Sequence, residues 1–206
     1  MTRGRKSAGP EQIDARRAQV LDAAAACFSR SGFHGARMAD ISKAAGMSAG
    51  HIYHYFESKE AIIAALVERD RNELHDVLES FRAQSDFIDA MIEGVDQGVA
   101  RAARPARSAI KMELLAEAAR NPKVAELLRQ ADCEARCGFR SSLAAALAAR
   151  GNTDTVDLDA KVVLIGAMFN GLAARGVFAE PLQQEALARV MRRAITAILD
   201  DESAAD

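Results

Sequence analysis

Apolar residues recur every three or four positions along most of this chain, which is the spacing of one face of an α-helix. In residues 11–30, for example, Val20, Ala24 and Phe28 repeat at intervals of four. No segment of the sequence alternates apolar and polar residues as a half-buried strand does. Alanine is abundant and β-branched residues are sparse outside short clusters, which favours helix over strand. These features predict an all-α fold.

Glycine, proline and serine mark the points where these helices begin and end. Gly46 follows a short apolar-periodic segment, at a position where a left-handed residue ends a helix. Pro105, Pro122 and Pro181 stand where a first helical turn accepts a residue without an N–H. Together the signals predict helices at 11–30, 38–45, 48–55, 58–82, 86–101, 105–120, 122–150, 157–176 and 181–199.

The two short helices at 38–45 and 48–55, joined through Gly46, predict a helix-turn-helix. The second helix of this motif enters the major groove of DNA with its first turns near the base edges. Ser48, Ala49 and Gly50 are small at that leading end and would let the helix backbone approach DNA closely.

Four further side chains of this region are suited to DNA. His51 and His54 lie three positions apart on one face, and an imidazole can donate to or accept from a base edge. Tyr53 and Lys59 offer a hydroxyl and an ammonium to phosphate. The alternatives are a packed aromatic for Tyr53 and a solvated charge for Lys59.

Charge is unevenly distributed along the chain. Residues 1–59 hold nine Lys and Arg against five Asp and Glu, whereas residues 60–206 hold eighteen against twenty-four. A basic N-terminal part is the part to test for nucleic-acid binding, although ordinary scatter explains such a split about equally well. We predict a disordered basic arm at 1–10 and a disordered acidic tail at 200–206.

No apolar segment resembles a signal peptide or a membrane span. The longest nearly uncharged stretch, 162–174, is interrupted by glycine and is too short to cross a bilayer. Three cysteines form an odd count, which favours reduced thiols over disulfides. We therefore expect a cytoplasmic protein that does not bind a membrane.

The sequence GFHGARMADISKAAGMSAGHIYHYFESKEAI, residues 32–62, resembles the DNA-binding signature of the TetR (tetracycline-repressor) family. The order and spacing that carry the resemblance are those of Gly32-Phe33, Asp40-Ile41, Ala45-Gly46, Ser48, Gly50, Tyr53, Tyr55-Phe56 and Lys59. The resemblance implies that Tyr53 and Lys59 contact the DNA backbone. It departs from the family at Ala36-Arg37, where Thr or Ser is usual, and Arg37 could replace that phosphate contact with a charged one.

The resemblance also implies a homodimer in which two helices of each subunit form a four-helix interface. The candidate interface residues are the apolar residues of the last two helices: Val162, Ile165, Phe169, Leu172, Met191, Ile195 and Ile198. An ordinary core within one chain would use some of the same residues.

Soft and aromatic side chains between 86 and 140 could line a cavity for a small-molecule effector. They are Phe87, Met91, Met112, Leu115, Cys133, Cys137 and Phe139. Their helical spacing alone makes core packing the first interpretation, also for the two cysteines. Cys133 and Cys137, at i and i+4, could hold a metal or act as a thiol switch, but no nearby His or third Cys completes a metal site.

We therefore predict a three-helix DNA-binding domain at 11–57 and a helical ligand-binding and dimerisation domain at 58–199. The expected function is a ligand-responsive transcriptional regulator, a repressor that binds a near-palindromic operator as a dimer, without cofactor or metal. The alternatives are an activator of the same fold and a helical small-molecule-binding protein that does not read DNA. An enzyme is excluded because the sequence contains no phosphate loop, nucleophile elbow, complete metal set or convincing triad.

Overall fold

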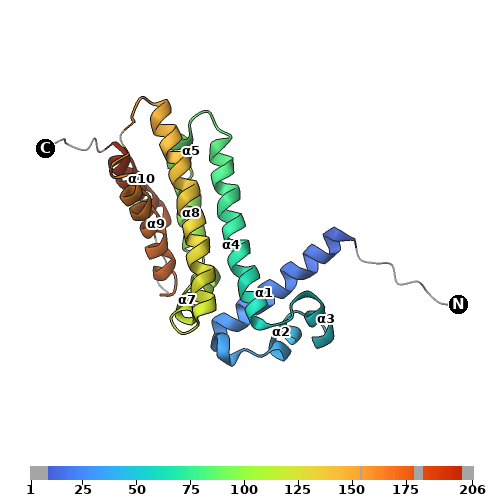
Figure 1. The fold of residues 1–206 in the computed structure, drawn as a ribbon. Coiled ribbons are helices and arrows are strands. Elements are labelled where there is room, and N and C mark those ends of the chain that lie inside the picture. The colour runs from blue at the N-terminus through green and yellow to red at the C-terminus, as the bar shows by residue number, and fades with distance from the viewer. Residues whose placement is uncertain (1–8, 154, 179–182, 201–206) are drawn as a thin grey trace. The chain divides into compact units, whose positions relative to one another are not determined.

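The computed structural model describes residues 9–153, 155–178 and 183–200, and these residues form ten α-helices and no strand (Figure 1). The predicted all-α class is confirmed. The chain divides into two compact units, Met1–Leu66 and Val67–Asp206. The predicted disordered arm and tail lie outside the described residues, except for Gly9, Pro10 and Asp200.

The first unit consists of α1 (Pro10–Gly35), α2 (Met38–Ala44), α3 (Ala49–Tyr55) and the first turns of α4 (Lys59–Arg82). The sequence signals predicted these four helices, and their ends differ by a few residues. The largest difference is at the end of α1, because the chain turns at Gly32 (φ 70°) and then adds one more turn.

The core of the first unit is built from apolar side chains of all four helices. Those with an exposed fraction of 3% or less include Val20, Ala24, Phe28, Phe33, Ile41, Ile52, Phe56, Ile62 and Ile63. Ile62 and Ile63 belong to α4, so the first turns of this helix contribute to the unit. The first compact unit therefore extends into α4, as far as Leu66.

The second unit contains the rest of α4 and six more helices. These are α5 (Phe87–Glu93), α6 (Val95–Ala102), α7 (Pro105–Ala118), α8 (Pro122–Ala149), α9 (Leu158–Arg175) and α10 (Gln184–Asp200). The single helix predicted at 86–101 is wrong, because the chain breaks at Gly94. A Cβ on Gly94 would lie 2.6 Å from Cζ of Phe81, so a glycine is required where the Phe81 ring packs against the backbone.

The core of the second unit lies between α5, α6, α8, α9 and α10, and α8, α9 and α10 run alongside one another (Figure 1). Its buried side chains include Phe87, Met91, Val99, Leu143, Val162, Ile165, Met191 and Ile195. Gly98 of α6 allows the Phe169 ring of α9 to pack closely, since a Cβ at this position would lie 2.6 Å from Cε1 of Phe169.

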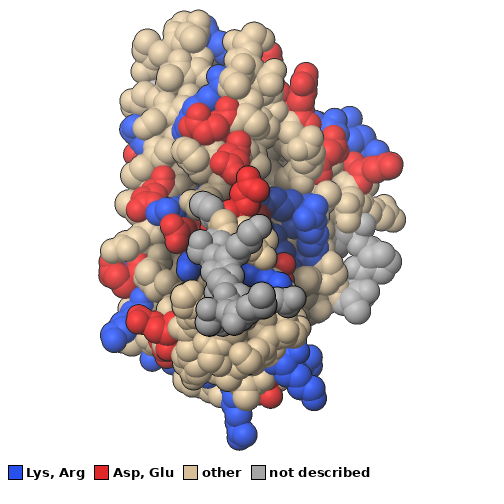
Figure 2. All heavy atoms as spheres, turned by 90° about the vertical axis from the view of Figure 1, so that its right-hand side faces the viewer, with Lys and Arg blue, Asp and Glu red and all other residues tan. Residues whose placement is uncertain are grey.

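Ion pairs connect the helices at the surface of the second unit. Arg101 and Arg107 both donate to Glu73 of α4 at 2.9 Å, and Arg107 also pairs with Asp70. Basic and acidic side chains are correspondingly interspersed over much of the face shown in Figure 2. None of the described helices is long and apolar enough to cross a membrane.

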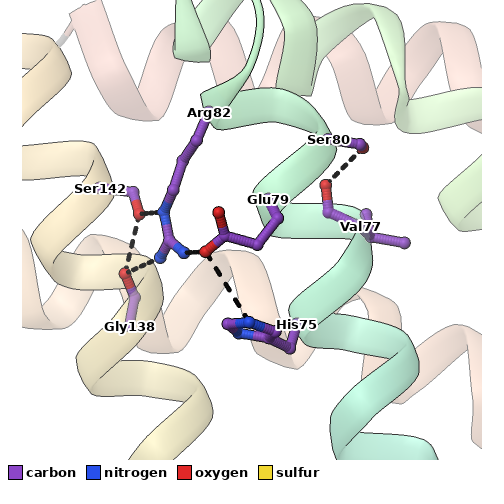
Figure 3. A network of polar contacts seen from close by, with 7 residues as sticks. All are labelled: His75, Val77, Glu79, Ser80, Arg82, Gly138 and Ser142. Atoms are coloured by element: carbon purple, nitrogen blue, oxygen red, sulfur yellow. Dashed lines mark hydrogen bonds and ion pairs between the residues drawn. The ribbon is translucent and has the colours of Figure 1, made fainter.

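A polar network joins the end of α4 to α8 (Figure 3). The Arg82 guanidinium donates to Oγ of Ser142 at 2.7 Å and to the carbonyl oxygen of Gly138 at 3.1 Å. Arg82 also pairs with Glu79, which lies 3.9 Å from Nε2 of His75. About three turns earlier along α4, Arg71 donates to Glu134 of α8 at 2.8 Å. Several polar contacts therefore fix the position of α4 against α8.

Candidate nucleic-acid interface

The turn between α2 and α3 is fixed by hydrogen bonds as well as by Gly46, whose φ is 63°. Oγ of Ser48 accepts from the amide of His51 at 3.3 Å and so caps α3. Oγ of Ser42 donates to the carbonyl of Met47, and Nε2 of Gln19 donates to the carbonyl of Ala45 at 2.8 Å. The two helices are thus held in one arrangement before any ligand is present.

The inner and outer faces of α3 differ sharply. Ile52 is fully buried, whereas Ala49, Gly50, His51 and His54 are all exposed. A Cβ on Gly50 would meet no other described part of the chain within 4 Å. Packing within the described chain therefore does not require a glycine here, and this end of α3 is open to another molecule.

Tyr53 and the two histidines present polar atoms on this open face. Tyr53 is 53% exposed, so it is not the packed aromatic of the alternative interpretation. His51 lies with Nε2 3.4 Å from the hydroxyl of Tyr55, and the His54 ring contacts the Tyr55 ring edge-on at 5.3 Å. Tyr55 is half-buried and therefore limits the orientations of both imidazoles.

Lys59 is more deeply involved in the fold than its sequence suggested. Its Nζ donates to the carbonyl oxygens of Phe33 at 2.6 Å and Ala36 at 2.9 Å, and lies 4.5 Å from the centre of the Phe33 ring. These carbonyls end α1, where a cation is also favoured by the helix dipole. Lys59 thus joins the start of α4 to the end of α1, and one of its three N–H donors remains for another partner.

Arg37 precedes α2, and its side chain is exposed. Its backbone N–H donates to Oδ2 of Asp40 at 3.0 Å. Asp40 therefore satisfies the N–H of Arg37 at the start of α2, and the guanidinium of Arg37 is left at the surface.

Sequence reasoning missed one residue of this region, Arg17. Its Nη1 donates to the carbonyl of Tyr55 at 3.2 Å, and its guanidinium lies 4.6 Å from the centre of the Phe56 ring. Arg17 therefore holds the C-terminal end of α3 against α1. Nothing in the sequence distinguishes Arg17 from the neighbouring Arg16, because the contact joins residues 38 positions apart.

The candidate interface residues of α9 and α10 lie mainly in the core of their own chain. Val162, Ile165, Met191 and Ile195 are buried, and Phe169, Leu172 and Ile198 are half-buried against the same core. The opposite face of α9 is exposed and carries the apolar or small residues Ala160, Val163, Leu164, Ala167 and Gly171.

The candidate effector residues do not come together as one set. Phe87 and Met91 are buried, and the Phe87 ring lies 6.3 Å from the half-buried Phe139 ring. Met112 is half-buried on α7, whereas Leu115, Cys133 and Cys137 are exposed. Within the described residues, no three or more His, Cys, Asp or Glu side chains are grouped to hold a metal ion.

A short helix with an open face, capped by serine and held through a glycine turn, defines a helix-turn-helix DNA-binding protein. Residues 20–66 match the model of the bacterial regulatory proteins of the tetR family, and residues 85–200 match the C-terminal model of BetI-type transcriptional repressors. The chain belongs to the TetR family, whose members are DNA-binding transcriptional regulators and not enzymes.

Individual relatives agree with this assignment. The chain is 37% identical to the transcriptional regulator UidR of Escherichia coli K12 over 116 residues, which are 55% of this chain and only 57% of UidR. It is 30% identical to the solved structure of Salmonella enterica GusR, with a TM-score of 0.71 over 95% of this chain and 99% of GusR. Bacillus subtilis FadR, solved with stearoyl-CoA, has the same fold at 16% identity, with a TM-score of 0.73 over 89% of this chain and 97% of FadR.

Proposed function

We propose that this protein is a cytoplasmic, ligand-responsive transcriptional repressor that binds a near-palindromic operator as a homodimer through α3. The observation that carries the proposal is the open face of α3. Its leading end is small, its polar side chains are exposed, and Ile52 anchors its inner face in the core. Within TetR-family architecture, this is the face that would enter the major groove.

In this proposal the residues of the open face have two kinds of role. His51 and His54 contribute to sequence preference, because their ring nitrogens can bond base edges. Ser48, Ala49 and Gly50 allow the backbone to approach. Tyr53, Arg37 and the remaining N–H of Lys59 contact phosphates, which position the helix without reading sequence.

These roles can be separated by measuring DNA affinity at several salt concentrations. Arg37→Gln should weaken binding to all duplexes and reduce the slope of log K against log salt by about 0.9, because one phosphate contact is lost. Arg129→Gln, which removes an exposed charge from α8, is the matched control and should leave the slope unchanged. Equal slopes for the two variants would contradict a phosphate contact by Arg37.

The contribution of His54 is tested by selection from a randomised duplex library. His54→Ala should broaden the selected site at one position in each half, since each good base contact contributes about 1–3 kcal/mol of discrimination. His75→Ala changes another exposed histidine, on α4, and should select the same site as the unchanged protein. An unchanged site for His54→Ala would rule out base reading by this residue.

We place the dimer interface on the outer face of α9 together with the exposed apolar residues of α10. Leu164 is 51% exposed and Val190 is 64% exposed, and the outer face of α9 described above carries no charge. Two such faces would bury apolar surface that a monomer leaves in water. The buried residues of the original prediction, such as Ile195, would support this surface from behind.

Sedimentation velocity tests the interface. Ala167→Asp places a charge on the outer face of α9 and should give monomers, whereas Ala145→Asp places the same charge on an exposed alanine of α8 and should leave the dimer intact. A dimer that survives Ala167→Asp at micromolar concentration would refute this placement.

The effector would act in the second unit, through α4. Phe87, Met91 and Phe139 offer an apolar lining beside α4 and α8, and Met112 could contribute from α7. An effector that separates these side chains would strain the contacts of α4 with Glu134, Gly138 and Ser142. Since α4 continues into the DNA-binding unit, a shift of this helix would change the spacing of the two reading helices in a dimer.

A further inference from the structure

Cys133 and Cys137 form a pair of exposed thiols on one face of α8. Their sulfur atoms are 4.0 Å apart, one helical turn from each other, and both side chains are exposed. Cys27, by contrast, is 1% exposed in the first unit. The chain therefore presents two accessible thiols close together and holds the third in its core.

The sulfur separation suits a single atom bound to both thiolates. Two bonds of about 2.3 Å that meet at roughly 95–105°, the angle at a pyramidal atom with a lone pair, hold their sulfurs about 3.4–3.6 Å apart. The two exposed side chains reach this separation from 4.0 Å by a small rotation. A disulfide fits less well, because it brings the two Cβ atoms to about 3.5–4.5 Å, whereas residues i and i+4 of a helix hold them about 5–6 Å apart. Bridging by one atom leaves α8 intact, and a disulfide does not.

The surroundings limit the ligands of the bridging atom to two. No third His, Cys, Asp or Glu joins the pair within the described residues. The nearest carboxylates along α8 have other partners, since Asp132 accepts from Arg136 at 2.8 Å and Glu134 from Arg71 at 2.8 Å. Zinc, which takes four ligands, is not satisfied by this pair.

We propose that Cys133 and Cys137 form a bidentate site for trivalent arsenicals that carry one organic group. Such a compound, R–As(OH)2, has two exchangeable positions and needs two thiols. The exchange is balanced: two S–H bonds and two As–O bonds break, two As–S bonds form, and two molecules of water leave. No oxidant or reductant takes part.

The raised pKa of the Cys137 thiol agrees with ligand exchange on arsenic and not with peroxide sensing. The hydrogen bond with Cys133 is the main cause that raises the pKa of Cys137 above its ordinary value, and the nearby charges of Arg136 and Arg140 oppose this only in part. A raised pKa disfavours the free thiolate that reacts with peroxides. A thiol pair that stays protonated can still exchange with an arsenous acid and release water.

The site lies where α8 contacts α4. Glu134 and Gly138 each follow one of the two cysteines, and they accept from Arg71 and Arg82 of α4, respectively. Figure 3 shows the contact of Arg82 with Gly138. A bridge between residues 133 and 137 restrains this turn of α8. We therefore expect an arsenical bound here to act on α4 as a second effector. This regulatory part of the proposal rests on the proposed function.

Phenylarsine oxide is the probe, with intact-protein and peptide mass spectrometry as the readout. The native protein should gain one phenylarsenic group, and its titratable thiols after denaturation should fall from three to one. Trypsin cleaves after Arg136, between the two cysteines, so a bidentate adduct should join peptides 130–136 and 137–140. Excess ethanedithiol should remove the adduct, whereas the same concentration of a monothiol should not.

Cys133→Ser and Cys137→Ser should each abolish the stable adduct, and Cys27→Ala is the matched control that should retain it. An adduct that survives in Cys133→Ser, or its absence from the unchanged protein, would overturn the site. The regulatory part is tested separately by DNA affinity, which one equivalent of probe should reduce at least tenfold in the unchanged protein and not in Cys133→Ser. An adduct without this reduction overturns only the regulatory part. DNA binding measured without the probe tests the proposed function separately, and Cys133→Ser should leave that binding unchanged.

Discussion

Replacing Lys59 by methionine keeps most of the length of the side chain but removes the ammonium that joins α4 to α1. Two hydrogen bonds are lost, to the carbonyls of Phe33 at 2.6 Å and Ala36 at 2.9 Å. Hydrogen bonds from a charged donor contribute about 1.5–3 kcal/mol each. Because Lys59 is only half-buried and methionine still packs on the Phe33 ring, we expect a loss of about 2 kcal/mol in the stability of the first unit.

Native-state amide hydrogen exchange measures this loss where it occurs. A loss of about 2 kcal/mol corresponds to roughly thirtyfold faster exchange of the protected amides in α1 and in the first turns of α4. Lys43→Met is the control, because it removes the same charge from an exposed position on α2. If the two variants exchange at the same rates, the hydrogen bonds of Lys59 do not stabilise the unit and the reasoning is wrong.

Three further predictions concern packing, acid stability and capping. Gly98→Ala should destabilise the second unit by about 1–2 kcal/mol in urea unfolding, because the new Cβ would displace the Phe169 ring. Gly138→Ala is the control and should be neutral or stabilising, because its new Cβ would lie 3.8 Å from Nη2 of Arg82, an ordinary contact distance. The Arg150 guanidinium, and after it the Asp89 amide, lower the pKa of Asp86 from 3.8 to about 2. This carboxylate therefore stabilises the fold above pH 3.8, and its contribution is lost as the pH falls toward 2. Arg150→Gln should raise the pKa of Asp86 in a carboxyl NMR titration, and an unchanged pKa would contradict the role of Arg150. Ser48→Ala should cost about 1 kcal/mol and speed exchange at the start of α3, and unchanged exchange there would show that the cap is not needed.

The sequence predicted the start of most helices because single residues determine them. Pro105 and Pro122 begin α7 and α8, and Ser48 caps α3, as their positions before apolar-periodic segments indicated. The helix predicted at 86–101 was wrong because the need for Gly94 comes from the Phe81 ring, which is distant in sequence.

The inward face of α9 could not be predicted from spacing. This helix is apolar on nearly all sides, so Val162 and Ile165 in the core alternate with exposed Val163 and Leu164. The prediction therefore named residues that the chain buries in its own core, and the dimer proposal moves to the outer face of α9.

Sequence reasoning predicted which residues of the short helix α3 are exposed, and it missed the tertiary contacts of this region. The exposure of His51, Tyr53 and His54 follows from the buried face set by Ile52. The contacts of Lys59 and Arg17 join residues more than twenty positions apart, so only the folded chain reveals them.

The most direct test of the central claim is selection of genomic DNA fragments by the purified protein, followed by affinity on the best fragment at two salt concentrations against random duplex. A dimeric reader with α3 in the major groove should select a near-palindrome whose half-sites lie about one helical turn apart, and should prefer it to random DNA by about a thousandfold or more. Weak binding that depends on salt but not on sequence would contradict operator recognition by α3.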